Sequence, residues 1–91
     1  MRVFIPLDAY PNQTASTTIK NVRWSIELNT RLGRLYATVS NEADGVIVRN
    51  RLCLDGIFIT KNLVFIDQDG NQDPVYDGLG GRFALVWTDE S

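Results

Sequence analysis

Oxygen-bearing side chains recur at every second position of the segment DQDGNQDP, residues 67–74. The candidates for metal ligation are Asp67, Asp69, Asn71 and Asp73. Calcium prefers such oxygens, and the helix-loop-helix calcium site places them at loop positions 1, 3 and 5, with glycine at 6 and glutamate at 12. A frame that begins at Asp67 puts Gln72 at position 6 and Gly78 at position 12, so that pattern fails.

Turn formation is the competing interpretation of the same segment. Asp and Asn side chains bond to their own backbone, and glycine tolerates positive φ. We therefore expect a polar turn between two strands, and we predict no metal and no cofactor. A looser group of carboxylates on a hairpin stays open as an alternative, because calcium accepts irregular oxygen shells.

Catalytic residue types are scarce. The chain has 91 residues and no histidine, so it lacks the commonest general base and the commonest metal ligand. Cys53 is the lone cysteine, and we expect a buried free thiol in a reducing cytosol. Arg49 and Arg51 would activate this thiol if it were exposed, but no base or second thiol accompanies it. We therefore predict that the protein is not an enzyme.

The elements that would position these residues are strands. Apolar and polar residues alternate in residues 22–29, 35–40 and 82–88, which is typical of strands with one buried face. No stretch of ten residues shows the spacing of an amphipathic helix, and at most one helical turn is expected, near residues 75–79. Turn signals stand between the strands, at Lys20 and Asn21, Leu32 to Arg34 and residues 41–45. Asp55 and Gly56 form a dipeptide that is typical of hairpins, so we expect a hairpin there.

Residues 1–91 are thus expected to form one all-β domain of about seven or eight short strands. With no helix to cover a sheet, the sheet must fold onto itself as a small antiparallel β-barrel or a two-layer sandwich. Trp24 and Trp87 lie on the apolar sides of their strands, which favours core packing. No apolar run approaches the roughly 18 residues of a membrane helix, and the first ten residues do not resemble a secretory signal.

Three apolar runs break the alternation, at residues 46–48, 57–59 and 63–66. Either the core buries both of their faces, or another chain covers one face. The charge is also uneven: residues 1–51 carry a net charge of +3 and residues 52–91 a net charge of −5. Such asymmetry can orient a partner, although charged turns alone could produce it.

Nucleic-acid binding is a second class of function that the composition allows. Small β-barrels bind single strands by stacking bases on aromatic side chains in a basic groove. Only Tyr36 lies on a polar face near arginines, Arg31 and Arg34, and the net charge of the chain is −2. We therefore keep a module that binds single-stranded nucleic acid or carbohydrate as the alternative function, with nucleic acid unlikely as a specific ligand.

The order of the motifs along the chain resembles that of a known family. The motifs are IPL at residues 5–7, PNQT at 11–14, RWSIELNTR at 23–31, LYATVS at 35–40, RLCLDGIFI at 51–59, NLVFID at 62–67 and DPVYDGLGGRFALVW at 73–87. In this arrangement the chain is similar to the small baseplate plug proteins of contractile-tailed bacteriophages, the family typified by the plug of a cyanophage baseplate. The resemblance covers roughly residues 3–88.

The resemblance implies a structural virion protein that is assembled in the host cytoplasm and is located in the tail baseplate. Such a plug would close the tube lumen and contact hub, spike and tail-tube proteins; a homo-oligomer is also open, and no membrane is involved. Unpaired strand edges and the charge asymmetry would provide the contacts. Our candidates for the contact residues are Val46, Ile47, Val48, Asp67, Asp69, Tyr76 and Asp77.

Overall fold

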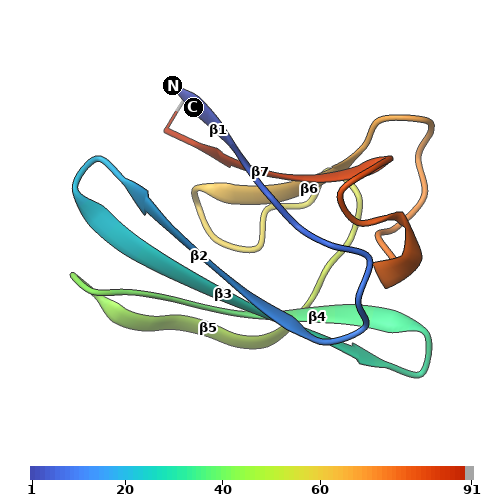
Figure 1. The fold of residues 1–91 in the computed structure, drawn as a ribbon, viewed down its shortest axis with the longest axis horizontal. Helices are drawn as coiled ribbons and strands as arrows, with labels where there is room; N and C mark the ends of the chain where they lie inside the picture. The colour runs from blue at the N-terminus through green and yellow to red at the C-terminus, as the bar shows by residue number, and fades with distance from the viewer. Residues whose placement is uncertain (90–91) are drawn as a thin grey trace.

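The computed structural model describes residues 1–89 and contains two stacked antiparallel sheets (Figure 1). Their strands are β1 (Arg2–Ile5), β2 (Gln13–Ile19), β3 (Val22–Arg31), β4 (Arg34–Asn41), β5 (Gly45–Leu52), β6 (Leu63–Asp67) and β7 (Phe83–Thr88), and one 3-10 helix, η1 (Tyr76–Gly78), precedes β7. The strand orders are β1-β7-β6 and β2-β3-β4-β5. The all-β prediction is confirmed, and the fold is the sandwich, not a closed barrel.

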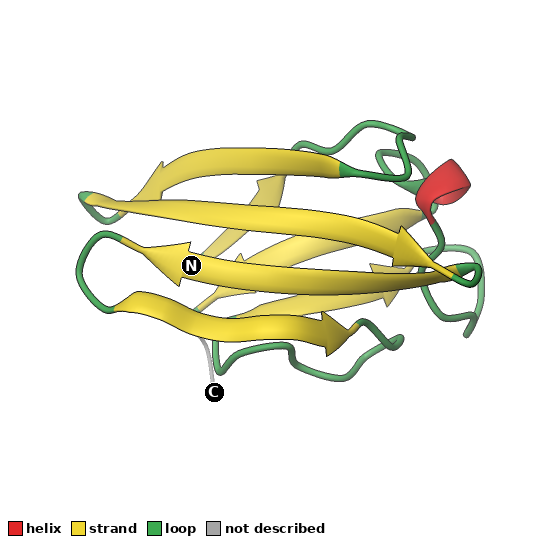
Figure 2. Ribbon diagram, turned by 90° about the horizontal axis from the view of Figure 1, so that it is seen from below, coloured by secondary structure: helices red, strands yellow, loops and turns green. Residues whose placement is uncertain are grey.

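Strand β3 shows how the alternation builds the four-stranded sheet. Trp24, Ile26 and Leu28 are buried, whereas Arg23 and Glu27 are exposed. Successive side chains of a strand point to opposite faces, so one face of β3 packs inward and the other meets solvent. Figure 2 shows this sheet from below, in front of the three-stranded sheet, with the loops and η1 gathered mainly at one end.

Two tight hairpins connect the strands of this sheet. Lys20 and Asn21 join β2 to β3 with φ angles of 51° and 65°, and Leu32 and Gly33 join β3 to β4 with φ angles of 51° and 75°. Two consecutive left-handed residues match the twist of the flanking strands. Both turns were predicted from the sequence, as was the helical turn at η1.

The dipeptide Asp55 and Gly56 was predicted to form a hairpin, and this prediction is wrong. Gly56 has a φ of 70°, as a turn requires, but the strands before and after it, β5 and β6, do not pair with each other. The chain instead runs along the outer edge of β6, where Asp55 and Phe58 form isolated bridges with Phe65 and Val64. A turn dipeptide favours reversal of the chain but does not determine the next pairing partner.

The core lies between the two sheets. Phe65, Ile26 and Leu35 are almost completely buried, and the Trp24 and Trp87 rings meet edge to face at 6.2 Å, which joins the two sheets. Cys53 is free and buried, as expected. The run at residues 63–66 is buried at three positions, and Ile66 is 40% exposed.

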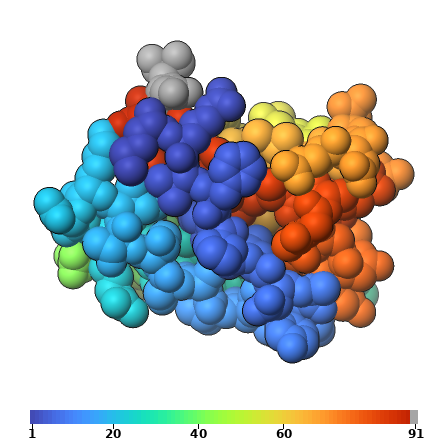
Figure 3. Space-filling model, turned by 45° about the horizontal axis from the view of Figure 1, so that its top comes forward, coloured from blue at the N-terminus to red at the C-terminus, as the bar shows by residue number. Residues whose placement is uncertain are grey.

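One side of the sandwich is closed by the N-terminal segment. Figure 3 shows residues near the N-terminus (dark blue) lying between the β2–β3 hairpin (light blue) and the C-terminal segments (orange and red). The amino group of Met1 donates to Oδ1 of Asp89 at 2.9 Å, and Lys20 donates to Oδ2 of the same carboxylate. These contacts bring the chain ends together and lower the pKa of Asp89 to about 2, with the Lys20 hydrogen bond as the main cause.

The charge asymmetry of the sequence follows the two sheets. The four-stranded sheet, with its turns, takes up residues 13–52, which hold six of the seven basic residues of the N-terminal half. Three of the seven acidic residues of the C-terminal half, Asp69, Asp73 and Asp77, lie in the connection between β6 and β7. In residues 1–89 no helix has the length and apolar character to span a membrane.

Candidate interaction surfaces

The acidic loop predicted from the sequence is built around one buried carboxylate. Asp67 ends β6, and its carboxylate accepts hydrogen bonds from the backbone N–H groups of Asp69 at 3.0 Å and Gln72 at 2.9 Å. Arg82 donates to both carboxylate oxygens, from Nε at 2.9 Å and from Nη2 at 2.6 Å. Because Arg82 favours the ionised form most, followed by the two backbone donors, the pKa of Asp67 lies well below its usual range.

The remaining acidic candidates do not converge on Asp67. Asp69 and Asn71 are exposed, and Oδ1 of Asp73 accepts a hydrogen bond from the backbone N–H of Asp55 at 3.0 Å. Among the residues described, no group of three or more His, Cys, Asp and Glu could hold a metal ion. The oxygens of Asp67 serve the backbone of the loop and Arg82, which is the arrangement of a structural turn.

The same loop presents an exposed surface beyond its buried carboxylate. Tyr76 and Asp77 lie on η1, and Tyr76 is 38% exposed beside Val75 at 37%. Asp69 lies on the same connection between β6 and β7. The structure therefore leaves Asp69, Tyr76 and Asp77 available for contact, whereas Asp67 is committed to the fold.

Strand β5 is the most exposed strand of the four-stranded sheet. Val46 is 48% exposed, Ile47 is 37% exposed, and Val48 packs partly against the core. The strand lies at the end of the sheet and pairs only with β4 among the residues described. The apolar run at residues 46–48 is thus not fully buried inside the molecule, which leaves the interface interpretation in place.

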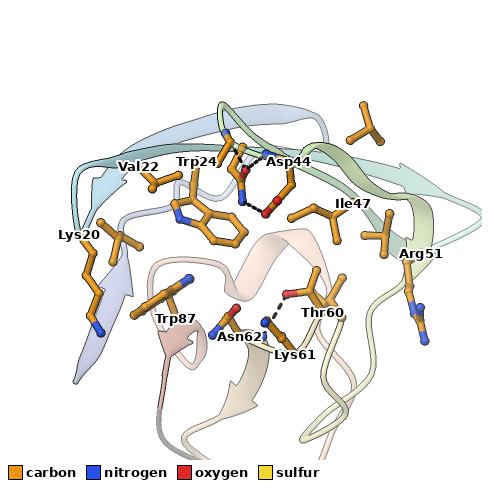
Figure 4. Close-up of a pocket in the computed structure, with 16 residues that line it drawn as sticks. Lys20, Val22, Trp24, Asp44, Ile47, Arg51, Thr60, Lys61, Asn62 and Trp87 are labelled. Carbon is orange, nitrogen blue, oxygen red and sulfur yellow. Dashed lines mark hydrogen bonds between the residues drawn. The ribbon is translucent and has the colours of Figure 1, made fainter.

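A groove of about 610 Å³ lies beside β5, between the two sheets (Figure 4). Val46, Ile47 and Val48 contribute from β5, and Trp24 and Trp87 contribute from the core. Lys20, Arg51 and Lys61 add positive charge to its lining. Both tryptophans were predicted to lie in the core. The groove beside them was not predicted, because the chain segments that form it are far apart in the sequence.

A second apolar patch covers the outer face of the three-stranded sheet; the runs at residues 57–59 and 63–66 were flagged from the sequence, whereas Phe4 was not predicted to belong to it. Phe4 is 60% exposed and Ile66 is 40% exposed, and Phe58 at 44% lies against the adjoining edge. The pairings Phe4 with Val86 and Val64 with Val86 put these side chains on one face. A useful signal was present, since the apolar residues of β1 and β6 do not alternate with polar ones.

Tyr36, the candidate for stacking nucleic acid bases, is partly buried on β4. The guanidinium of Arg31 lies 5.6 Å from the centre of its ring. This cation–π contact occupies a face of the ring that a base would need. The observed arrangement thus gives the nucleic-acid alternative little support.

A family model described as cyanophage baseplate Pam3 plug gp18 matches residues 2–90 of the 91-residue chain. The chain belongs to this baseplate plug family. No curated protein matches the chain. Membership in the plug family gives the protein a structural role in a phage tail baseplate, in association with other baseplate and tail components.

Proposed function

We propose that the protein closes the central channel of the baseplate, so that the tube lumen stays sealed until DNA must pass. The family match over residues 2–90 is the observation that carries this proposal. The protein would act without catalysis, by occupying space and by contacting hub, spike and tail-tube proteins. Its assembly into the tail would take place in the host cytoplasm.

The dimensions of the molecule suit such a role. Its principal extents are 32 × 24 × 19 Å, so its cross-section is comparable to the width of duplex DNA. A sandwich with a close-packed core resists compression, which a steric block requires. A channel wider than one molecule would need several copies, and this leaves homo-oligomers within the proposal.

Retention of a plug requires contacts that hold during storage and yield on contraction. Exposed apolar patches on a small protein are typical of surfaces that meet a partner. Here they are the outer face with Phe4 and Ile66, and the β5 edge with Val46 and Ile47. Asp69, Tyr76 and Asp77 would provide polar contacts from the loop after β6.

Deletion of the gene for this protein from its phage tests the function. Tails that lack the plug are expected to assemble incompletely or to release DNA early, which nuclease sensitivity of the packaged genome measures. Electron cryomicroscopy of wild-type tails should show a β-sandwich in the baseplate channel. Complete, fully infective tails without the protein would refute the proposal.

A solution experiment addresses the nucleic-acid alternative. Trp24 and Trp87 supply an intrinsic fluorescence signal, and single-stranded DNA is titrated at low salt. The plug function predicts no quenching. Tight, salt-sensitive quenching would favour the nucleic-acid module instead, because binding to phosphates weakens steeply with salt.

A further inference from the structure

The two sheets of the sandwich have four edges, and the edge of β6 is covered by residues 55–59. The N–H of Gly56 donates to the carbonyl of Phe65 at 2.9 Å, and the N–H of Ile59 donates to the carbonyl of Leu63 at 2.8 Å. The edges of β1 and β2 touch each other on the side that the N-terminal segment closes. The edge of β5 touches no other strand edge, and its outer backbone groups have no partner strand among residues 1–89.

The uncovered edge borders the groove described above. Figure 4 shows Ile47 above the opening, with Trp24 and Trp87 at one end and Thr60 to Asn62 on the opposite wall. An extended chain that pairs with β5 would place alternate side chains into this groove, because side chains of a strand alternate between its two faces. The groove therefore gives the edge a means of selecting apolar side chains.

An unpaired polar atom lies in the same groove. Nε1 of Trp87 is the one buried side-chain nitrogen or oxygen without a hydrogen-bond partner within residues 1–89, and the side chain is 5% exposed. Figure 4 shows this nitrogen on the side of the ring that faces the groove. A buried donor without an acceptor is unfavourable, and a docked segment would remove that penalty only if the side chains around the nitrogen moved to admit a carbonyl oxygen.

The charges around the groove indicate the character of the segment. Arg51 and Lys61 contribute to the lining and form no ion pair with any described residue, whereas Lys20 is already bound to Asp89. Asp44 also lines the groove, and it keeps its negative charge, since its partner is the neutral amide of Asn41, whose Nδ2 donates to it at 3.3 Å. Acidic side chains on the segment would complement the two cations, Arg51 and Lys61.

We propose that β5 is a docking edge that takes an extended segment of a partner baseplate protein as a fifth strand. The segment has apolar side chains that enter the groove and acidic side chains that meet Arg51 and Lys61. A second copy of the chain is the competing occupant, and the crosslinking experiment below distinguishes it from another baseplate protein. This inference rests on the proposed function, since the partner is taken from the baseplate.

Two irregularities in β5 limit the docking edge. Val46 and Val48 pair with adjacent residues of β4, which leaves Ile47 as an extra residue between them, and a second irregularity falls between Val48 and Arg51, where Asn50 has a φ of 48°. Bulges bend an edge strand and interrupt regular pairing. The docked segment should thus pair only over short stretches on either side of Ile47, with its acidic side chains near Arg51.

Two variants with matched chemistry test the docking edge. Ile47→Lys puts a charge on β5, and Leu32→Lys replaces an exposed apolar side chain by the same charge in the β3–β4 turn, outside both apolar patches. Ile47→Lys is expected to lower incorporation into purified tails by about tenfold or more, the effect of losing one important contact. Leu32→Lys should incorporate like the wild type, and equal incorporation of both variants would overturn the proposal.

Charge reversal provides a second variant that leaves the apolar edge unchanged. Arg51→Glu combined with Lys61→Glu should also reduce incorporation, and the matched control is Arg34→Glu, an exposed arginine at the start of β4. Circular dichroism before incorporation verifies that each variant is folded. Full incorporation of the double variant would overturn the acidic character of the segment.

A photo-crosslinking side chain at position 47 identifies the occupant in assembled tails. The expected product joins residue 47 to an extended, acid-flanked segment of another baseplate protein. A product between two copies of this chain, or no product at position 47 while the protein is present in the tail, would overturn the inference. Absence of the wild-type protein from purified tails would instead refute the proposed function, so the two failures are distinguishable.

Discussion

The guanidinium of Arg82 holds the carboxylate of Asp67 by two hydrogen bonds, from Nε to Oδ1 at 2.9 Å and from Nη2 to Oδ2 at 2.6 Å. The pair joins the end of β6 to the residue before β7 and fixes the loop between them. The Asp67 side chain is fully buried, whereas that of Arg82 is 32% exposed. Two-point pairing of this kind also fixes the direction of both side chains.

The Asp67–Arg82 pair predicts a loss of stability in acid. The pKa of Asp67 is lowered in the folded protein, whereas the unfolded chain has a value of about 3.9. The carboxylate therefore stabilises the fold fully above about pH 5, and this contribution is lost as the pH falls through the folded pKa. Asp67→Asn should lower the Tm at pH 7 by at least about 5 °C and should flatten the dependence of Tm on pH below 5.

Thermal unfolding between pH 7 and pH 3, followed by circular dichroism, measures this effect. Asp77→Asn is the matched control, because Asp77 is an exposed aspartate of the same loop whose side chain accepts no hydrogen bond from any residue of 1–89. Asp89 also has a lowered pKa, about 2, and should give both proteins a residual slope in the same direction. Identical pH profiles for the wild type and Asp67→Asn would contradict the assigned role.

Local features of the fold could be predicted from the sequence because they depend on neighbouring residues. The alternation in β3 and β7 follows from one buried face, and the turn at Lys20 and Asn21 follows from strand twist and turn chemistry. The burial of Trp24 and Trp87 was predicted from the faces on which they lie. These inferences needed no knowledge of which strands pair.

Features that depend on pairing between distant residues could not be predicted in this way. Arg82 was not identified as the partner of Asp67, because 15 residues separate them and the loop geometry decides the contact. The segment after Gly56 covers β6 instead of forming a hairpin. This outcome depends on the outer edge of β6 having no other strand to pair with. The groove has the same origin, since it exists only where the ends of both sheets meet.

Leu32 offers a stabilising substitution. It is fully exposed in the β3–β4 turn with a φ of 51°, a region that costs an L-residue other than Asn or Asp roughly 1–2 kcal/mol. Leu32→Asn creates the Asn-Gly pair that such turns favour and should stabilise the protein by about 0.5–1 kcal/mol. Urea denaturation measures the change.

Leu32→Ala is the control for this turn, because it removes the exposed apolar side chain but keeps the unfavourable backbone preference. It should leave the free energy of unfolding within about 0.5 kcal/mol of the wild type. Equal stability of the Asn and Ala variants would mean that the left-handed conformation of residue 32 contributes no strain.

Gly78 is predicted to be intolerant of a side chain. A Cβ at this position would lie 2.5 Å from Cδ2 and 2.6 Å from Cε2 of Phe83, a buried ring at the start of β7. Gly78→Ala should therefore destabilise the protein by about 1–3 kcal/mol, the usual cost of overpacking. At Gly70 the nearest atoms would be 3.5 Å away, so Gly70→Ala should be nearly neutral in the same urea denaturation. Equal effects of the two substitutions would contradict the predicted clash.

Cys53 should be chemically inert in the folded protein. The thiol is 1% exposed, and burial raises its pKa to about 12, so almost no thiolate is present at pH 8. A thiol-specific disulfide reagent should label one cysteine per chain in urea and none on the same timescale in buffer.

Because burial favours the protonated form of Cys53, the thiol stabilises the fold fully below about pH 8.5, and this contribution is lost as the pH rises towards 12.

Ser16→Cys provides the internal control, because Ser16 is exposed on β2. The variant should lose one thiol to the reagent at once and the second only at the rate at which the protein opens. Adding Cys53→Ser to the Ser16→Cys variant should remove the slow phase of the reaction with the reagent and leave the fast phase. Rapid modification of both thiols in buffer would show that Cys53 is accessible, and would reopen the reactive-cysteine interpretation that the neighbouring arginines suggested.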